Sequence, residues 1–306
     1  PTIPSFRRVI VEFAELAPFT STHHHTLGCL GFVQLGDAME KPRPRLDGWA
    51  LVLGASSGFG AATARYLATC GMHIIGVHFD RRNTQPMADA VKKDIEASGQ
   101  MAHFFNINAG DADARTTVLD AVTPHVTSHD PPIRVLMHSI AFGTTVPYVS
   151  NADVAGVTRK QMDMTLDLMA NTIVYWTQDL TARDLLGRGS RIYAMTSAGT
   201  TTIWPSYGPV GAAKAGLEQH IRQLAVELAP RGITANAIRA GVTDTQALRK
   251  IPGNQAMLEQ AQRMNPAGRL TEPNDVARAI AALTVADADW ITGNVIGVDG
   301  GENLVM

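Results

Sequence analysis

Apolar and polar residues alternate in blocks along the chain from Leu46 onward. Ala50 to Leu53 is a short apolar run, residues 54–60 form a glycine-rich turn, and from Ala61 the apolar residues recur at helical spacing. A short apolar run followed by an amphipathic stretch then recurs toward the carboxyl end. The predicted strands cover residues 50–53, 73–79, 101–107, 134–140, 191–195, 233–238 and 295–298. The first predicted helix starts at residue 61. The others cover residues 85–98, 113–123, 160–186, 210–229 and 274–284.

Strands that alternate with helices in this way predict an α/β fold. Each strand is joined to the next by a crossover helix, and such connections make the strands parallel and place helices on both faces of the sheet. We therefore expect a doubly wound, Rossmann-type parallel sheet. The chain has 306 residues, enough for one large core, and no break in composition demands a second domain.

Residues 1–45 do not follow this alternation. Pro18 and the sequence Lys-Pro-Arg-Pro-Arg at 41–45 interrupt any continuous element in this part of the chain. We expect an N-terminal appendage, of which residues 1–38 are dispensable or lie upstream of the true start at Met39.

Composition and charge narrow the classes of function. The net charge is -2 and 45% of the residues are hydrophobic, which argues against a nucleic-acid or membrane-surface protein, and no apolar run has the length of a membrane span. Cys29 and Cys70 cannot build a disulfide framework, and Cys70 lies in an apolar helical stretch, so we expect a buried, reduced thiol and a soluble, cytoplasmic protein. The histidines at 23–25 have no acidic or cysteine partner at ligand spacing, so we assign no metal.

The glycine turn after the first strand predicts a nucleotide site. Gly54, Gly58 and Gly60 let the backbone approach a pyrophosphate closely, and the free amides at the start of the next helix attract anions. The spacing is Gly-x-x-x-Gly-x-Gly rather than the commoner Gly-x-Gly-x-x-Gly, and a plain turn is the alternative. We take residues 46–306 as a dinucleotide-binding catalytic domain that follows the appendage.

The residues after the second strand bear on the choice of cofactor. Asp80 stands close to the place where a carboxylate binds the ribose of NADH, but Arg81 and Arg82 follow at once and could bind the 2′-phosphate of NADPH. A solvated, charged strand end is the alternative. The sequence leans slightly toward NADPH and leaves NADH open.

Candidate catalytic residues follow the fifth strand. Thr196 and Ser197 stand at its carboxyl end, where ligands bind in such sheets, and Tyr207 comes after them in a short loop. Pro209 suits the first position of the next helix, which places Tyr207 just outside that helix and Lys214 on its second turn. The tyrosine and the lysine can therefore converge near the cofactor.

Taken together, these motifs resemble the short-chain dehydrogenase/reductase family over about residues 46–302. The shared features are the glycine turn, Ser197, Tyr207, Lys214 and the segments Asn236-Ala-Ile, Pro266-Ala-Gly-Arg and Val298-Asp-Gly-Gly. The usual pair of the family is Tyr-x3-Lys, which would need tyrosine where the chain has Val210. Tyr207 and Lys214 instead form Tyr-x6-Lys, which resembles the enoyl-acyl-carrier-protein reductases, as do His138-Ser-Ile-Ala-Phe and Asp244-Thr-x-Ala-Leu.

The resemblance implies a role for each candidate. Tyr207 contacts a thioester carbonyl, Lys214 bonds the nicotinamide ribose, and Ser197 is the third catalytic member, although many enoyl reductases carry a second tyrosine there. The implied cofactor-binding residues are Gly54, Ser56, Ser57, Gly58, Phe59, Gly60, Asp80, Arg81, Asn106, Ile107, Ser139, Ile140, Ala141, Thr196, Lys214, Gly241, Thr243 and Thr245. The implied substrate-binding residues are Phe142, Trp204, Tyr207 and Met257.

Several of these roles have alternatives. Asn106 stands where the family often has an adenine-contacting aspartate, or it is a strand-end turn residue. Residues 246–264 are either a mobile lid over an acyl chain or an ordinary amphipathic helix, and Trp204 either lines the acyl pocket or fills the core. The relay asparagine of carbonyl-reducing members would fall near Met169, whereas Asn171 lies about 200° around a helix from that position, which favours enoyl chemistry.

The resemblance implies NAD(P)H-dependent reduction of the C2=C3 double bond of a 2-enoyl thioester in fatty acid biosynthesis. A displaced tyrosine fits this reaction, because hydride reaches C3 while negative charge appears on a more distant oxygen. A carbonyl reductase or alcohol dehydrogenase of the family is the alternative, and a nucleotide-sensing protein without turnover is a third. Arg249, Lys250 and Arg263 either meet an acidic acyl carrier protein or are solvated. The family pattern implies a homotetramer built partly through helices 160–186 and 210–229.

Overall fold

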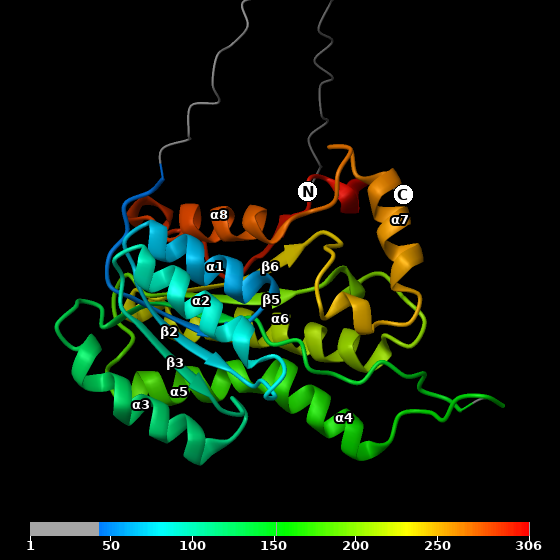
Figure 1. Cartoon of the computed structure of the whole chain (residues 1–306), viewed down its shortest axis with the longest axis horizontal. Helices are drawn as coiled ribbons and strands as arrows, with labels where there is room; N and C mark the ends of the chain where they lie inside the picture. The colour runs from blue at the N-terminus through cyan, green and yellow to red at the C-terminus, as the bar shows by residue number, and fades with distance from the viewer. Residues whose placement is uncertain (1–42, 151, 306) are drawn as a thin grey trace, which may run out of the picture. The chain divides into compact units, whose positions relative to one another are not determined.

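Seven parallel strands form a single sheet at the centre of the fold. The computed structural model describes residues 43–150 and 152–305, all within the second of the two units into which the chain divides at Lys41–Pro42. The strand order is β3-β2-β1-β4-β5-β6-β7, and every neighbouring pair is parallel (Figure 1). The strands are β1 (Trp49–Leu53), β2 (His73–His78), β3 (Ala102–Asn106), β4 (Ile133–His138), β5 (Arg191–Thr196), β6 (Thr234–Ala240) and β7 (Val295–Val298).

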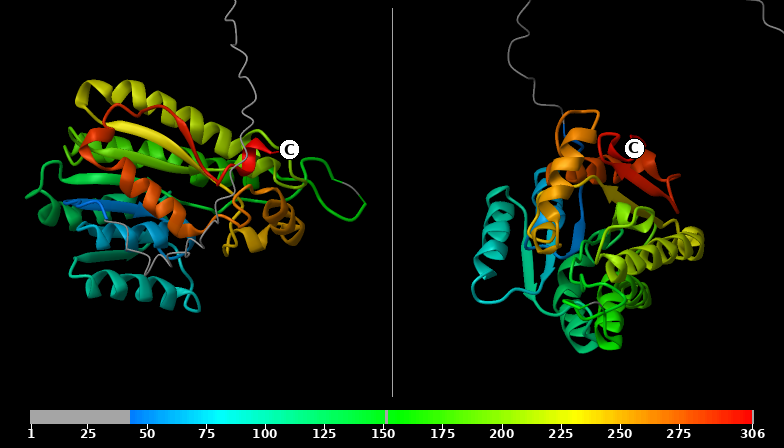
Figure 2. Two further views of the ribbon diagram at one scale, coloured as in Figure 1. Left: turned by 90° about the horizontal axis from the view of Figure 1, so that it is seen from above. Right: turned by 90° about the vertical axis from the view of Figure 1, so that its right-hand side faces the viewer.

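Helices cover both faces of this sheet. The helices are α1 (Gly58–Thr69), α2 (Gln85–Ala97), α3 (Ala112–Val126), α4 (Arg159–Leu166), α5 (Thr172–Ala182), α6 (Gly208–Leu228), α7 (Asn254–Met264) and α8 (Pro273–Leu283). Apolar residues of α1, α2 and α8 join one core cluster, and those of α3, α5 and α6 join the other. Figures 1 and 2 show these two helical layers on opposite sides of the strands. The predicted doubly wound α/β fold is confirmed.

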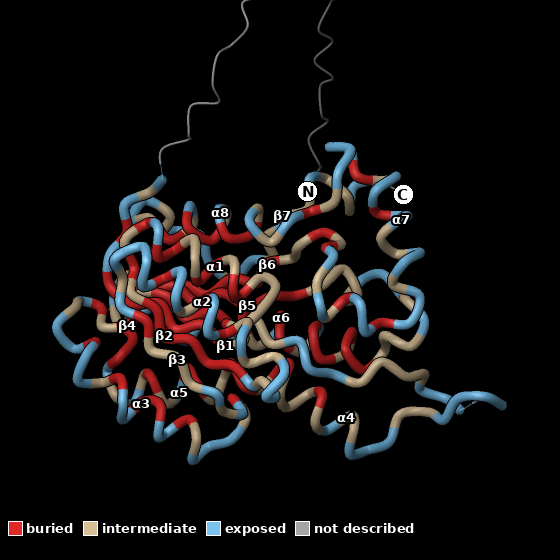
Figure 3. Tube along the Cα trace, viewed as in Figure 1, coloured by how far each residue is buried: buried red, intermediate tan, exposed pale blue. Residues whose placement is uncertain are grey.

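The two cores explain why the central strands are apolar throughout. Every residue of β1 and of β5 is buried, because helices pack on both of their faces. The edge strands β3 and β7 are only partly buried and carry a less continuous apolar pattern. Figure 3 shows the buried positions concentrated on the central strands, with buried and exposed positions alternating along the helices. The strand order reverses between β1 and β4, and their carboxyl ends therefore flank the crevice where ligands bind in such folds.

The predicted continuous helix over 160–186 is wrong. A five-residue π-helix, Asp167–Asn171, separates α4 from α5, and α5 ends at Ala182. The backbone N–H and the hydroxyl of Thr172 both donate to the carbonyl oxygen of Asp167, five residues earlier, the hydroxyl at 2.8 Å. A wider turn of this kind rotates the residues that follow it relative to an ordinary α-helix.

The structure also bears on the predictions for the cysteines and for membrane-spanning helices. Cys70 is buried and unpaired, and burial raises the pKa of its thiol, as expected for a reduced core cysteine. Cys29, the histidines at 23–25 and the proposed dispensable segment 1–38 lie outside the described residues. No helix within 43–150 and 152–305 is both long and apolar enough to span a membrane.

Candidate functional site

The turn between β1 and α1 is packed so closely that a side chain does not fit at two of its positions. A Cβ on Gly60 would lie 2.1 Å from the carbonyl oxygen of Gly54, and a Cβ on Gly54 would lie 2.3 Å from that of Ser139. Gly54 also has a φ of +94°, in the left-handed region that favours glycine. The glycine turn and the segment after β4 therefore pack backbone against backbone, with no room for a side chain between them.

The start of α1 completes a cradle for an anionic group. Helix α1 begins at Gly58, and Ser57 before it makes no side-chain cap to the first-turn amides. A Cβ on Gly58 would stand 3.7 Å from Thr245, so the loop after β6 passes beside the turn. Bare glycine backbone next to an uncapped helix N-terminus fits the pyrophosphate of a dinucleotide.

A charged carboxylate stands at the end of β2. Nδ1 of His78 lies 3.0 Å from Oδ2 of Asp80, and hydroxyls of Ser56 and Thr84 also bond to this carboxyl. Burial opposes ionisation, but the three hydrogen bonds outweigh it and hold the pKa of Asp80 below its usual value. Because Ser56 belongs to the glycine turn, Asp80 is joined to the cradle at the place where a dinucleotide ribose lies in this type of sheet.

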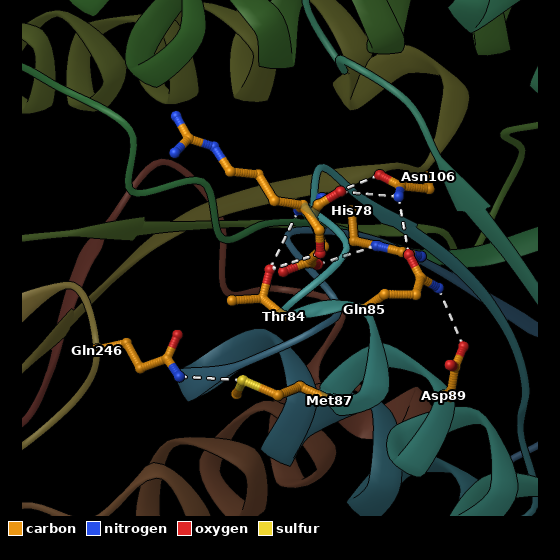
Figure 4. A network of polar contacts seen from close by, with 9 residues as sticks. His78, Thr84, Gln85, Met87, Asp89, Asn106 and Gln246 are labelled. Carbon is orange, nitrogen blue, oxygen red and sulfur yellow. Dashed lines mark hydrogen bonds and ion pairs between the residues drawn. The ribbon is translucent and has the colours of Figure 1, made fainter.

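The side chain of Asn106, a candidate adenine contact, is engaged by other protein groups. Its Oδ1 accepts from the N–H of Asp80 at 2.9 Å, and its Nδ2 donates to the Asp80 carbonyl at 3.0 Å and to Oε1 of Gln85 at 2.8 Å (Figure 4). The Ile107 N–H donates to the His78 carbonyl at 2.8 Å. The end of β3 therefore serves to hold the end of β2 in place.

The three candidate catalytic residues converge at the carboxyl ends of β4 and β5. Tyr207 is the residue immediately before α6, and Lys214 lies on the second turn of that helix. The Tyr207 hydroxyl donates to Oγ of Ser197 at 3.3 Å. Nζ of Lys214 donates to the carbonyl of Met195 at 2.7 Å and to that of Ile140 at 3.4 Å. These bonds join the start of α6 to the strand ends that face the glycine turn.

Burial shifts the pKa of both ionisable candidates toward the neutral form. Desolvation raises the pKa of Tyr207, although the bond to Ser197 opposes that shift. Desolvation lowers the pKa of Lys214 to about 7 from an ordinary value of 10.5. A protonated phenol just before α6, together with an ammonium that forms near neutral pH on the second turn of that helix, suits an oxygen that gains negative charge during a reaction.

A second buried titratable group is coupled to Lys214. His138, the last residue of β4, is fully buried, and its Nε2 lies 3.3 Å from the carbonyl oxygen of Leu168 in the π-helix. Burial, with a smaller contribution from the charge of Lys214, lowers the pKa of His138 to about 3. The imidazole is therefore neutral at physiological pH, and its contact with Leu168 joins β4 to the π-helix.

The π-helix determines which side chain faces the loop after β4. A Cβ on Gly143 would lie 2.6 Å from Sδ of Met169, which is 2% exposed. Oδ1 of Asn171 instead lies 3.2 Å from Nε2 of His220 on α6. The thioether of Met169 therefore packs against the loop after β4, whereas the amide of Asn171 contacts α6.

The predicted substrate residues lie on three separate segments. Phe142, after β4, is 52% exposed. Nε1 of Trp204 donates to the carbonyl of Pro252 at 3.2 Å, which ties the loop before α6 to the loop before α7. Met257 lies half-buried on α7, a helix in which Ala261 alone is buried. Helix α7 is thus a lightly packed element, and the Trp204 contact holds the loop just before it.

Most of the predicted cofactor residues follow the strands whose carboxyl ends meet at one edge of the sheet. Thr196 is the last residue of β5, and after β1, β4 and β6 come Gly54, Ser56, Ser57, Gly58, Phe59, Gly60, Ser139, Ile140, Ala141, Gly241, Thr243 and Thr245. At the ends of β2 and β3 stand Asp80, Arg81, Asn106 and Ile107, of which the Arg81 side chain is exposed. Thr196 is already occupied, because its hydroxyl donates to Oε1 of Glu218 at 2.8 Å.

Further residues of this region escaped the sequence analysis. Glu218 lies one helical turn after Lys214 on the buried face of α6, so helical spacing could have drawn attention to it. The ring of Tyr148 would lie 2.7 Å from a Cβ on Gly208, beside the start of α6. Gln246 donates to Sδ of Met87 on α2 at 3.0 Å (Figure 4). The last two contacts join segments about 60 and 159 positions apart along the chain, which local patterns do not reveal.

Two family models and many known proteins match this chain. A family model described as enoyl-(acyl carrier protein) reductase matches residues 54–303, and one described as the NAD(P)H binding domain of trans-2-enoyl-CoA reductase matches residues 14–85. The 1-cyclohexenylcarbonyl-CoA reductase of Streptomyces collinus is 26% identical over 259 residues, 84% of this chain and 87% of that protein. The 3-oxoacyl-[acyl-carrier-protein] reductase FabG of Aggregatibacter actinomycetemcomitans is 29% identical over 255 residues, 82% of this chain and 97% of that protein.

A solved structure supports the same conclusion. A short chain dehydrogenase from Burkholderia cenocepacia in complex with NADP superposes with a TM-score of 0.70 at 27% identity, over 86% of this chain and all of that chain. The fold and the site therefore define an NAD(P)H-dependent oxidoreductase. Since the first family model spans most of the sequence, the chain belongs to the short-chain dehydrogenase/reductase family, in the group that this model describes.

Proposed function

We propose that this protein uses NAD(P)H to reduce the C2=C3 double bond of a 2-enoyl thioester. The observation that carries the proposal is the position of the tyrosine. Tyr207 stands outside α6 and seven residues before Lys214, and the position that a Tyr-x3-Lys pair would use holds Val210, which is 4% exposed. A substrate oxygen bonded by Tyr207 would therefore occupy a different position from one bonded by a tyrosine on the first turn of α6.

This displacement matches the charge pattern of enoyl reduction. NAD(P)H, when bound, supplies the hydride, which the substrate accepts at C3. Negative charge then gathers on the thioester oxygen, where the Tyr207 hydroxyl would donate its hydrogen bond, and a proton subsequently reaches C2. A charged Lys214 would favour the same enolate electrostatically. Once the phenol proton points to the thioester oxygen, Ser197 would orient the phenol by donating its own hydroxyl proton across the 3.3 Å that separates the two oxygens.

The cofactor and the acyl group would occupy the segments described above. Gly54, Gly60 and the start of α1 would hold the pyrophosphate, and Asp80 would lie at the adenosine ribose. Residues 246–264, held through the contact of Trp204 with Pro252, would form a lid over the acyl chain. Met257 of this lid and Phe142 would contact that chain. Because Met169 occupies the position against the loop after β4, no asparagine side chain would relay a proton there.

Consumption of NADH and of NADPH, followed at the reduced-nicotinamide absorbance with crotonyl thioester, tests the reaction. Tyr207→Phe should lower kcat/KM by roughly a hundredfold or more, because one donor to a developing oxyanion is lost. Tyr66→Phe, on α1, is the matched control and should leave the rate unchanged. Retained turnover in Tyr207→Phe would refute the assigned role of this residue.

Ketone reduction is the second candidate, because the FabG relative at 29% identity is a 3-oxoacyl-[acyl-carrier-protein] reductase. Acetoacetyl thioester, run in parallel with crotonyl thioester, separates the two reactions. Reduction of the ketone alone would replace the enoyl proposal. A nucleotide-sensing role without turnover would need the biological activity to survive Tyr207→Phe.

We extend the proposal to the carrier of the acyl group and to assembly. Arg249 forms two hydrogen bonds of 2.8 Å with Asp244, which leaves Lys250 and Arg263 as the charges for an acidic acyl carrier protein. A carrier-bound substrate should then be preferred over its coenzyme A thioester, and salt should weaken that preference. Sedimentation should report a homotetramer, and a monomer would contradict the assembly proposal.

A further inference from the structure

A buried histidine holds the carboxylate at the end of β2. The side chain of His78 is 2% exposed and that of Asp80 is 12% exposed, and the two are joined by the 3.0 Å contact between Nδ1 and Oδ2. The ring of Phe104 on β3 lies 6.0 Å from the imidazole, centroid to centroid. The imidazole therefore has little room to turn, and it restricts the orientation of the carboxylate.

The backbone that carries Asp80 is also fixed. Asn106 bonds both the N–H and the carbonyl of Asp80, and Gln85 in turn binds Asn106 and Asp89 (Figure 4). The hydroxyl of Thr84 accepts from the Arg81 N–H at 3.2 Å and closes the turn that follows. Contacts from β3 and from α2 thus hold the peptide, and the His78 contact holds the side chain.

A fixed, ionised carboxylate distinguishes the two nicotinamide cofactors. It accepts hydrogen bonds from the ribose hydroxyls of NADH, and it repels the 2′-phosphate of NADPH. Arg81 and Arg82, which could offset that repulsion, are exposed, and such side chains lose rotamer entropy when they are ordered around a ligand. The geometry at Asp80 favours NADH, in contrast to the slight sequence preference for NADPH.

We propose that His78 is a specificity-determining residue that positions Asp80 as the acceptor for the adenosine ribose hydroxyls and thereby selects NADH over NADPH. This inference rests on the proposed cofactor site and is independent of which substrate is reduced. His78 acts through Asp80, so it is a positioning residue, and its removal should change the ratio of the two cofactor affinities.

Titration of the purified full chain with each reduced cofactor, followed by nicotinamide fluorescence without substrate, measures that ratio. The wild type should bind NADH more tightly than NADPH. His78→Phe should raise the Kd for NADH on the order of tenfold, the effect of losing one hydrogen bond to a charged group, and change the Kd for NADPH much less. His78→Asn, which keeps a donor, should retain most of the preference, and His125→Asn, at an exposed histidine on α3, is the matched control.

Asp80→Asn keeps the test decisive if His78→Phe does not fold. Asp80→Asn should remove the preference for NADH, and His78→Ala, which removes the donor, should change the ratio in the wild type but cause no further change when it is added to Asp80→Asn, because the two residues act as one unit. A wild type that prefers NADPH, or a His78→Phe variant whose ratio stays within twofold of wild type, would overturn the proposal. Failure of crotonyl reduction with an intact NADH preference would overturn the enoyl function and leave this inference standing.

Discussion

Acid should destabilise this protein partly through His138, which is buried in its neutral form at the end of β4. Its pKa is about 3 in the folded chain, and the ordinary value that applies after unfolding is 6.5. The depressed pKa means that the unfolded chain binds a proton that the native protein excludes. The stability associated with neutral His138 is therefore present above pH 6.5 and is lost as the pH falls below it.

The size of the effect follows from the two pKa values. At pH 7 the imidazole is mostly neutral in both states, so His138 has little effect on the free energy of unfolding. At pH 5 the unfolded imidazole is almost fully charged and the native one is not, which lowers the free energy of unfolding by about 2 kcal/mol relative to pH 7. A domain with a typical total of about 5–15 kcal/mol would lose a measurable share of its stability.

Urea unfolding of wild type and His138→Asn, followed by circular dichroism at pH 7 and pH 5, isolates this contribution. His73, His103 and His220 also have lowered pKa values because of burial, but they titrate alike in both proteins and cancel in the difference. The stability difference between wild type and variant should move by about 2 kcal/mol in favour of the variant on going from pH 7 to pH 5. A difference that does not change with pH would refute the reasoning that His138 is held neutral.

Three further changes test the packing of the site and the division of the chain. Gly60→Ala should cost about 1–3 kcal/mol of stability and weaken cofactor binding, because its Cβ would lie 2.1 Å from the Gly54 carbonyl oxygen. Gly216→Ala is the control, since its nearest neighbour would be at 3.7 Å, and it should be neutral or slightly stabilising in thermal melts; equal losses in both variants would contradict this view of the cradle. Trp204→Ala should release the segment before α7, because the indole no longer bonds the Pro252 carbonyl. Trypsin should then cleave residues 246–264 faster, and KM for the acyl thioester should rise. Cleavage at the wild-type rate would show that the indole does not hold this segment in place. A chain that begins at Met39 should melt at the same temperature and bind cofactor with the same Kd as the full chain, and loss of folding would show that residues 1–38 are needed.

The order of elements and the placement of the candidate catalytic residues were within reach of the sequence because both depend on local patterns. Continuous apolar runs identified the buried strands, and helical spacing identified the helices between them. The glycine turn, Tyr207 and Lys214 were also readable, because short spacings within one turn or one helix fix their relative positions. Parallel strand order then brings their carboxyl ends to one edge without any further information.

The tertiary structure alone decided which side chains meet across that edge. The π-helix directs Asn171 to His220 and leaves Met169 against the loop after β4, although a regular helical period predicts a continuous element there. The contact of Trp204 with Pro252 joins residues 48 positions apart, which no local period encodes.

His78 and Asp80 show the same contrast between sequence and tertiary structure for two residues that are only two positions apart. Their closeness in sequence is plain, but whether the imidazole faces the carboxylate depends on the packing of Phe104 and on the amide of Asn106 from the neighbouring strand. A sequence pattern specifies the face on which a residue lies, because backbone periodicity is local. The partner on that face is set by the packing of segments distant in sequence, and this packing also sets the burial and the pKa values on which the proposed chemistry depends.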